Sequence, residues 1–300
     1  MINFFETVKE GLHFNKFELN DTICVEYTCP IENEQRIGLC SQSDYLVYIL
    51  SGKKTWKTIH GEWTLEAGST IYVKKGATLI NQFFEDEFCV LAFFISDDLI
   101  QESVIDIIGK MPLHNSNEAH QFTATEVATD NYLEGYFQSM LTYFRRKQSP
   151  SDYLLKLKLK ELLVNVICGN ENRLLASYLK SVACSGKPSL PHIMESNFCY
   201  NLKMEDFAKL CHRSLSTFKR DFHNHYNTTP GKWLLSKRLH YAANLVRNNF
   251  SGISQIAFES GFEDVSHFSR VFKDHFGLSP TTYRKIHSGH TKKYSLNLQI

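Results

Sequence analysis

The chain has 300 residues, of which 43% are hydrophobic and 22% charged, and its formal net charge is +1. This length favours two domains, and no apolar run approaches the ~20 residues that a membrane span needs. The N-terminal text MINFFETVKEGLHFN lacks the basic and apolar blocks of a signal peptide, and the eight cysteines form no CxxC pair. We therefore expect a cytoplasmic protein with reduced thiols, and neither a membrane protein nor a disulfide framework.

The charge is divided unevenly along the chain. From Gly186 to Ile300 there are 16 Lys and Arg against 8 Asp and Glu, a balance of +8. The first 185 residues hold 17 against 24, a balance of −7. A basic half beside an acidic half fits a nucleic-acid-binding domain joined to a domain with another task, and chance unevenness is the alternative.

Short segments with a period near two run from Ile23 to about Ser96. Turn signals such as Ser51-Gly52 and His60-Gly61 separate them. Many short strands with regular turns predict an antiparallel sandwich or barrel at about residues 20–100. The predicted strands are ICVEYTC, DYLVYIL, KKTWKTIH, EWTLEAG, STIYVKKG, ATLINQFF and FCVLAFFI.

The run GEWTLEAGSTIYVKKGA resembles the cupin pattern, with glycines at its corners. Cupin enzymes hold a metal, so a cupin-type metalloenzyme with an appended helical domain is the alternative function. A metal site needs three or four converging ligands, and the barrel region offers only His60. There is also no GxSxG, HExxH or GxxxxGK[ST] text. We therefore expect no metal, no cofactor and no enzymatic activity. If the barrel is hollow, we expect aromatic side chains to line it, although aromatic residues in a small barrel more often form a packed core. The expected lining residues are Tyr48, Trp56, Trp63, Tyr72 and Phe83.

After Asp97-Asp98 the pattern becomes helical. The expected elements are a short helix at Val104–Ile108, a loop at His114–Asn117, and helices at Val127–Lys147, Ser151–Cys168 and Asn172–Ala183.

One of these helices carries an apolar seam of Leu155, Leu159, Leu162 and Val166. The seam could pair with a second subunit, giving a homodimer, or pack on the chain's own barrel, and both uses stay open. Ser185–Pro188 has linker composition. We place the domains at 1–185, with helices at about 125–183, and at 186–290, followed by a tail at 291–300.

The second half contains one short text twice. STFKRDFHNHYNTTPGKW begins at Ser216, and SHFSRVFKDHFGLSPTTY begins at Ser266, so matched residues lie 50 positions apart. Self-similarity at a fixed period indicates one structural unit used twice.

Each copy predicts a helix, a tight turn and a second helix. In the first, Ser214 is the expected N-cap of a helix with a buried stripe of Leu215, Phe218 and Phe222. In the second, Gly261 supplies the turn, Asp264 caps the helix, and Val265, Phe268 and Phe272 repeat the stripe. Phe207-Ala208 matches Ile256-Ala257 at an offset of 49, so the second turn is one residue longer.

The polar faces of the two second helices suit a DNA major groove. A helix of roughly 28 Å at Gly231–Asn249 would space the two units for successive grooves, which lie about 34 Å apart. Two solvated surface helices are the alternative explanation. The predicted DNA-binding residues are Ser214, Ser216, Thr217, Lys219, Arg220, Val265, Ser266, His267, Ser269 and Arg270.

The texts DFAKLCHRSLSTFKRDF, PGKWLLSKRL and ISQIAFESGFEDVSHFSRVFKDHFGLSPTTYR resemble the DNA-binding domain of the AraC family of bacterial transcription regulators. The resemblance implies seven helices with two helix-turn-helix units, and base-reading side chains at positions 216, 217, 220, 266, 267 and 270. We thus expect an α+β chain with an N-terminal cupin-like barrel plus helices and a C-terminal all-α domain. The expected function is sequence-specific transcription activation on double-stranded DNA, with contacts to RNA polymerase. The N-terminal domain would respond to a small-molecule effector or a regulatory protein, would form a homodimer, or both.

Overall fold

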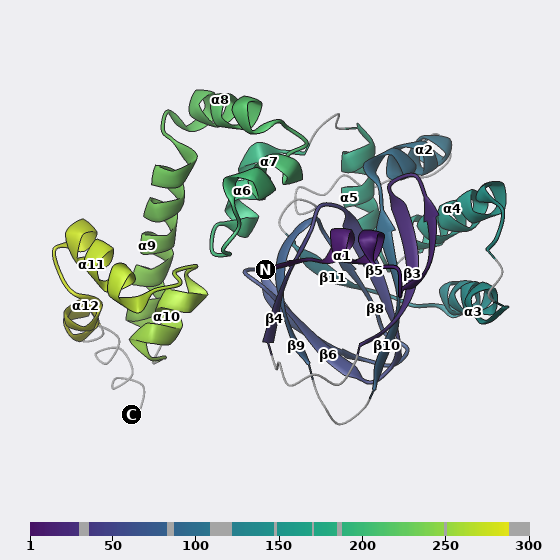
Figure 1. Cartoon of the computed structure of the whole chain (residues 1–300), viewed down its shortest axis with the longest axis horizontal. Helices are drawn as coiled ribbons and strands as arrows, with labels where there is room; N and C mark the ends of the chain where they lie inside the picture. Colours follow the sequence, from purple (N-terminus) through teal and green to yellow (C-terminus); the bar gives the residue numbers. More distant parts are fainter. Residues whose placement is uncertain are drawn as a thin grey trace, which may run out of the picture. The chain divides into compact units, whose positions relative to one another are not determined.

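The computed structural model of the chain describes residues 1–29, 36–82, 87–108, 122–146, 149–169, 171–184, 188–248 and 251–287. The chain divides into two compact units (Figure 1). The first comprises Met1–Ser196 with Leu210–His212, and the second comprises Asn197–Lys209 with Arg213–Ile300. The first unit is rich in strands and the second is helical, which confirms the predicted α+β class.

Two sheets face each other in the first unit. One has the strand order β1 (Ile2–Asn3), β4 (Arg36–Ser41), β9 (Gly76–Gln82), β6 (Lys53–Thr58) and β7 (Gly61–Glu66). The other has the order β11 (Ala124–Val127), β8 (Thr70–Val73), β5 (Asp44–Ser51), β10 (Phe88–Ile95), β3 (Thr22–Cys29) and β2 (Asn15–Leu19). Within these sheets β1 pairs with β4 in parallel, and the other pairs are antiparallel.

The predicted strands all occur, and the sequence analysis missed β1, β2, β4 and β11. Three of the missed strands, β1, β2 and β11, lie outside the regular stretch, and β4 is a six-residue strand within it. The strand β11, for example, pairs with β8 across more than 50 residues of chain, in the register Val127 to Thr70. No local pattern signals a pairing of that range.

Central strands of the six-stranded sheet are buried on both faces. Along β5, Tyr45 and Val47 point into the core between the sheets, whereas Leu46 and Tyr48 belong to a second core on the outer face. This alternation follows from the two-residue period of a strand. The predicted common lining of the barrel is therefore wrong in part. Trp56 and Trp63 face the space between the sheets, Tyr48 and Tyr72 face away from it, and Phe83 lies outside the described residues.

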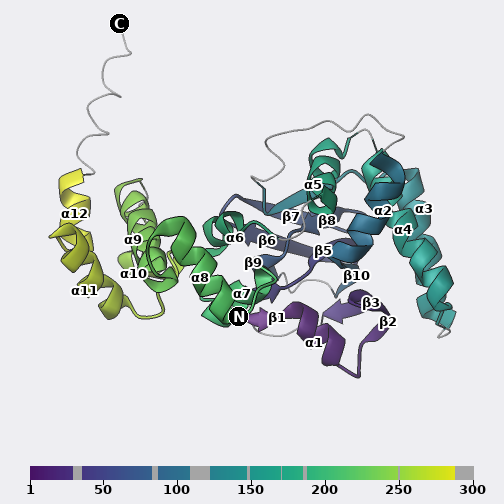
Figure 2. The same ribbon diagram turned by 90° about the horizontal axis from the view of Figure 1, so that it is seen from above.

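Helices cover the outer face of the six-stranded sheet (Figures 1 and 2). Ring stacking joins the two layers, with Tyr48 and Phe137 centroids 4.1 Å apart and Phe17 and Phe144 centroids 4.3 Å apart. The helices of this unit are α1 (Phe4–Glu10), α2 (Asp97–Ile108), α3 (Asn131–Arg146), α4 (Asp152–Cys168) and α5 (Arg173–Cys184).

Two predicted helix starts are wrong. The helix α2 begins at Asp97, not at Val104, because the acidic pair Asp97-Asp98 occupies its first turn and suits the positive end of the helix dipole. Val127 ends β11 and does not start a helix. The predicted loop at His114–Asn117 lies outside the described residues.

The seam of α4 is buried inside its own chain. Leu155, Leu159, Leu162 and Val166 are at most 3% exposed and belong to the core between the helices and the sheet. Of the two predicted uses of this seam, packing on the chain's own barrel is therefore confirmed, and pairing with a second subunit through these side chains is wrong.

Seven helices follow in the last part of the described chain, as the family resemblance implied. The first of them spans the division between the two units. The predicted domain boundary near residue 186 stays a prediction. The helices are α6 (Leu190–Asn197), α7 (Met204–Leu210), α8 (Leu215–Tyr226), α9 (Pro230–Asn248), α10 (Ile253–Glu259), α11 (Val265–Phe276) and α12 (Pro280–His287). No helix in the described ranges is long and apolar enough to cross a membrane.

Candidate nucleic-acid interface

The two sequence repeats fold into two turns with the same backbone hydrogen bond. The N–H of Arg213 donates to the carbonyl of Ala208 at 3.0 Å, and the N–H of Phe262 donates to the carbonyl of Ala257 at 3.0 Å. Each turn contains one left-handed residue, His212 with φ 52° and Gly261 with φ 86°. These pairs lie 49 positions apart, so the register seen in the sequence is also the register of the structure.

Both second helices are capped at both ends. Ser214 accepts from the N–H of Thr217 at 3.3 Å, and Asp264 accepts from the N–H of His267. At the C-termini, Asn227 and Gly277 are left-handed, with φ 52° and 73°. Each cap satisfies backbone groups that the helix end leaves without partners, so α8 and α11 have fixed ends. The predicted N-caps are confirmed.

An aromatic triangle holds each second helix against the helix that follows it. Phe222, Tyr226 and Trp233 have centroid separations of 4.6, 5.2 and 5.9 Å. The equivalent group of Phe272, Phe276 and Tyr283 has separations of 4.6, 5.5 and 5.4 Å. The triangles lie 50 positions apart and turn the same apolar face of α8 and α11 inward.

In each helix-turn-helix unit, an arginine of a later helix donates hydrogen bonds to backbone carbonyls that come earlier in the chain. Arg238 of α9 donates to the carbonyls of Phe198 and Tyr200, at 2.7 and 2.8 Å. Arg284 of α12 donates to the carbonyls of Val246 and Ser251, at 3.3 and 2.8 Å. The sequence analysis missed this pair, because the partners lie 33 to 40 residues away and are backbone atoms.

The predicted DNA-binding residues lie at the N-caps and along the outward faces of α8 and α11. Val265 packs partly against the core around Phe268, and the Ser214 hydroxyl is engaged in capping. The exposed members are Ser214, Ser216, Lys219, Arg220, Ser266, His267 and Arg270, and Thr217, Val265 and Ser269 are half-buried. The helices therefore present alcohol, imidazole and guanidinium groups, the kinds of side-chain group by which DNA-binding proteins in general contact base edges and phosphates.

The two faces differ in the residue that follows the shared arginine. Asp221 accepts from Arg213 Nε at 3.0 Å and lies 3.6 Å from Arg220 Nε, although the Arg220 side chain stays 71% exposed. The equivalent of Asp221 in α11 is Val271. Arg220 is thus held beside a carboxylate in α8, whereas Arg270 has an apolar neighbour in α11.

The alternative function, a cupin-type metalloenzyme, requires a cluster of metal-ligating side chains. Among the described residues, no group of three or more His, Cys, Asp or Glu side chains is placed to hold a metal ion.

Comparison with protein families identifies two matches on the chain. Residues 44–178 match the ExsA N-terminal regulatory domain, and residues 207–286 match a helix-turn-helix domain. The second match contains both repeats described above.

Several regulators are similar over most of their length. VirF, a virulence regulon transcriptional activator of Yersinia enterocolitica, is 24% identical over 246 residues, which cover 80% of this chain and 89% of VirF. ExsA, an HTH-type transcriptional regulator of Pseudomonas aeruginosa, is 26% identical over 242 residues, which cover 80% of this chain and 85% of ExsA. A crystal structure of ToxT from Vibrio cholerae covers 89% of this chain and 99% of its own, with 17% identity and a TM-score of 0.39.

A barrel-and-helix unit followed by two capped helix-turn-helix motifs defines a DNA-binding transcription regulator. The chain belongs to the AraC family and carries an N-terminal regulatory domain, as the sequence resemblance predicted.

Proposed function

We propose that the chain activates transcription by placing α8 and α11 in two successive major grooves beside a promoter. The proposal rests on the repeated geometry of the second unit, in which two capped helices have matching aromatic triangles and polar outward faces. The helix α9 between them has 19 residues and a length of roughly 28 Å, which suits two contacts on one face of the duplex. VirF, a similar protein, is named as an activator.

The base-reading role falls on the residues of the two outward faces. Ser216, Thr217 and Arg220 of α8 would contact one groove, and Ser266, His267 and Arg270 of α11 the next. Ser214, Lys219, Val265 and Ser269 would support these contacts at phosphates or at thymine methyl groups.

The N-terminal unit would control DNA occupancy, and the chain would act without enzymatic chemistry. We propose that it responds to a small molecule or to a regulatory protein, that the chain acts as a homodimer in the cytoplasm, and that it touches RNA polymerase. Light scattering of the full chain tests the dimer. The α4 seam is not part of this proposal, because its side chains are already buried.

Replacement of Arg270 tests the base-reading role. We expect Arg270→Ala to weaken binding to a selected high-affinity site by roughly 1–3 kcal/mol, about 5- to 150-fold, and to relax the base preference there. Selection from random duplexes with the full chain supplies the site, and a gel-shift titration measures both quantities.

Arg145→Ala is the matched control, because it removes one exposed arginine from the first unit. Circular dichroism verifies that both variants are folded. Unchanged affinity and unchanged base preference in a folded Arg270→Ala protein would remove the proposed role.

A further inference from the structure

The space between the two sheets of the first unit contains a cavity of about 170 Å³. Strands β4, β6 and β9 line it from one sheet and β3, β5 and β10 from the other, and β1 and α1 complete the wall. Lining residues recur at every second position, as in Tyr45 and Val47 or in Phe88 and Val90, because a strand turns alternate side chains to the same face. The inward faces of both sheets therefore form the cavity.

The lining of this cavity is almost entirely apolar. Twelve of the fourteen described residues around it are hydrophobic, and six of those twelve are aromatic. Ile2 and Thr7 are exposed and mark the side that solvent reaches. The buried part of the lining consists of side chains that are at most 6% exposed, namely Tyr45, Val47, Trp56, Ile80, Phe88 and Val90.

Polar groups beside the cavity interact within the chain. The Thr7 hydroxyl donates to the backbone carbonyl four residues earlier, at 2.7 Å. The Tyr45 hydroxyl lies 3.4 Å from Thr78 Oγ1, and burial raises the pKa of Tyr45 to about 12, so this hydroxyl stays uncharged. Lys54 Nζ lies 4.1 Å from the Phe88 ring centroid, within the range of a cation–π contact. Affinity for a ligand would therefore come from apolar contact and not from an ion pair.

The aromatic side chains of the lining meet at steep angles. The rings of Phe4 and Tyr45 are 5.7 Å apart at 84°, and those of Trp56 and Phe88 are 6.2 Å apart at 56°. Aromatic pairs prefer edge-to-face or offset contacts, and each such contact contributes beyond the area that it buries. Tilted rings around one space thus suit a further aromatic ring better than they suit an aliphatic chain.

The volume limits the ligand to one ring. An engineered cavity of about 150 Å³ lined by Leu, Ile and Phe stays dry and binds benzene. The cavity between the sheets is slightly larger, at about 170 Å³. We infer that it binds a small uncharged aromatic compound, with one ring and a short alkyl substituent.

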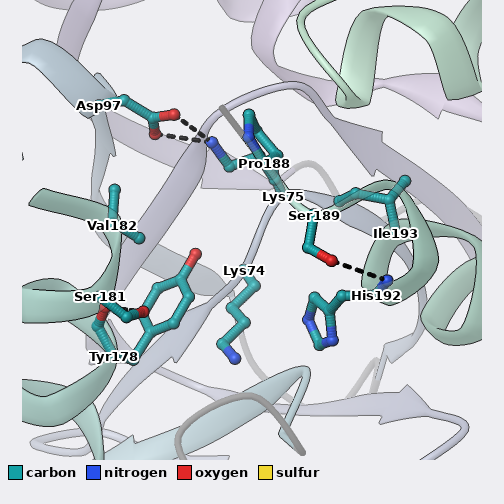
Figure 3. A pocket seen from close by; sticks show the side chains of 10 residues that line it. All are labelled: Lys74, Lys75, Asp97, Tyr178, Ser181, Val182, Pro188, Ser189, His192 and Ile193. Carbon is teal, nitrogen blue, oxygen red and sulfur yellow. Dashed lines mark hydrogen bonds and ion pairs between the residues drawn. The ribbon is translucent and has the colours of Figure 1, made fainter. Parts of the chain in front are cut away.

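A second cavity of the first unit, of about 100 Å³, has a different lining (Figure 3). Lys75 Nζ contacts both carboxylate oxygens of Asp97 there, at 2.6 and 2.7 Å. Lys74 Nζ lies 3.7 Å from the Phe122 ring centroid and 4.0 Å from that of Tyr178. Three charged side chains thus surround the cavity of Figure 3, whereas Lys54 is the one charged side chain among the described residues that line the cavity between the sheets.

The proposed function gives the inferred site a regulatory use, because the first unit would control DNA occupancy. That use rests on the proposed function, whereas binding of the aromatic compound does not. The two are measured separately, by ligand binding without DNA and by DNA binding with and without the ligand.

The test uses the full chain and two probes, toluene and ethylbenzene. Benzoate, which has the same ring and a negative charge, is the control for ligand charge, and equimolar chloride is the control for salt. We expect a saturable rise of the melting temperature with either probe, and no rise with benzoate beyond that with chloride. Calorimetric titration then gives the Kd of the better probe.

Three variants assign the site. Val47→Phe fills the cavity from β5, and we expect it to weaken that Kd by roughly tenfold or more. Val90→Phe fills it from β10 and should do the same, which keeps the test valid if one of the two proteins does not fold. Val164→Phe makes the same change at a half-buried position of α4 outside the cavity lining, and it should leave the Kd unchanged.

Three results would overturn the inference: no saturable stabilisation of the wild-type chain by toluene or ethylbenzene, equal stabilisation by benzoate, or full binding by a folded cavity-filling variant. Binding without any change in DNA affinity would keep the site and remove only its regulatory role. A failed Arg270→Ala test would concern the DNA interface alone and would leave the ligand result unaffected.

Discussion

At the scale of single residues, the protonation of Lys74 is linked to the stability of the first unit. Its pKa falls from an ordinary value of 10.5 to about 7 in the fold, because burial disfavours the charged amine. The unfolded chain therefore binds more protons than the folded chain between these two values. Stability then increases with pH in this window, since the cost of burying the charge disappears as the folded amine loses its proton.

We expect the free energy of unfolding to rise between pH 7 and 9, with a contribution from Lys74 of at most about 1.4 kcal/mol per pH unit. Asp44 raises the pKa of this lysine, the Tyr178 ring lies 4.0 Å from its Nζ, and burial and then the lysine lower the pKa of His60. Lys74→Met should lose the rise, and Lys156→Met, which removes an exposed lysine of α4, should keep it. Urea unfolding at several pH values measures the slope, and an equal slope in wild type and Lys74→Met would contradict the linkage.

The polar cluster around Asp44 also shows why the surroundings of a single residue are hard to predict from the sequence. Asp44 follows a turn at the start of a strand, where an aspartate usually caps or faces water. In the fold it joins β5, β8 and α5 through two tyrosine hydroxyls, one of them 134 residues away. Burial raises the pKa of Tyr72 and of Tyr178, and the nearby Asp44 carboxylate raises both further, so both hydroxyls remain donors at ordinary pH.

At the scale of elements, the helix-turn-helix units depend on one residue in each turn. Gly261 has φ 86°, and a Cβ at this position would lie 2.6 Å from the carbonyl oxygen of Cys199. Such a contact cannot be relieved cheaply, because the opposing atom belongs to the backbone. The first turn solves the same problem with His212 at φ 52°, a smaller angle that a side chain tolerates at some cost.

We expect Gly261→Ala to destabilise the second unit by roughly 1–3 kcal/mol or more, through backbone strain and through the clash. Gly135→Ala is the matched control. Gly135 lies within α3 with open space around its Cβ position, so alanine there should stabilise the helix by about 0.5–1 kcal/mol. Chemical unfolding of the full chain, followed by circular dichroism, measures both changes. A neutral effect of Gly261→Ala would show that the turn relaxes without strain.

The helix caps and the aromatic triangles explain why α8 and α11 are stable although they are short. Each has 12 residues, a length at which an isolated helix is marginal in water. Burial of Phe218 and Phe222 in α8, and of Phe268 and Phe272 in α11, supplies the stabilisation that the short helices lack. The polar residues are then free to face a ligand, because they take no part in the core.

At the scale of the whole molecule, the charge asymmetry predicts how the chain meets DNA. We expect residues 186–300, with a balance of +8, to bind duplex DNA with an affinity that falls steeply with salt. Residues 1–185, with a balance of −7, should show no such binding. The logarithm of the binding constant should fall linearly with the logarithm of salt, by about 0.9 per phosphate neutralised. Fluorescence anisotropy with a labelled duplex measures the slope. A folded C-terminal fragment whose DNA affinity is independent of salt would contradict this account.

The sequence determined the features that depend on neighbours along the chain. The repeat at 50 positions, its one-residue longer second turn, the caps at Ser214 and Asp264 and the apolar stripes are local patterns, and the structure reproduces them. The family assignment followed from the same text. The positions of β5 and β10 along the chain were predicted from equally local text, since both are short apolar segments bounded by turn signals.

Tertiary structure alone decided the features that join distant parts of the chain. It placed the α4 seam inside the chain's own core, although the sequence was equally compatible with a dimer contact. An apolar stripe predicts that one face of a helix is buried, but it does not identify the surface that buries it. It divided the barrel aromatics between two cores. It also brought Lys74, Tyr178 and His192 around one cavity, although more than 100 residues separate the first from the second. Neither the contacts nor the desolvation that changes the chemistry of Lys74 exists until the chain has folded.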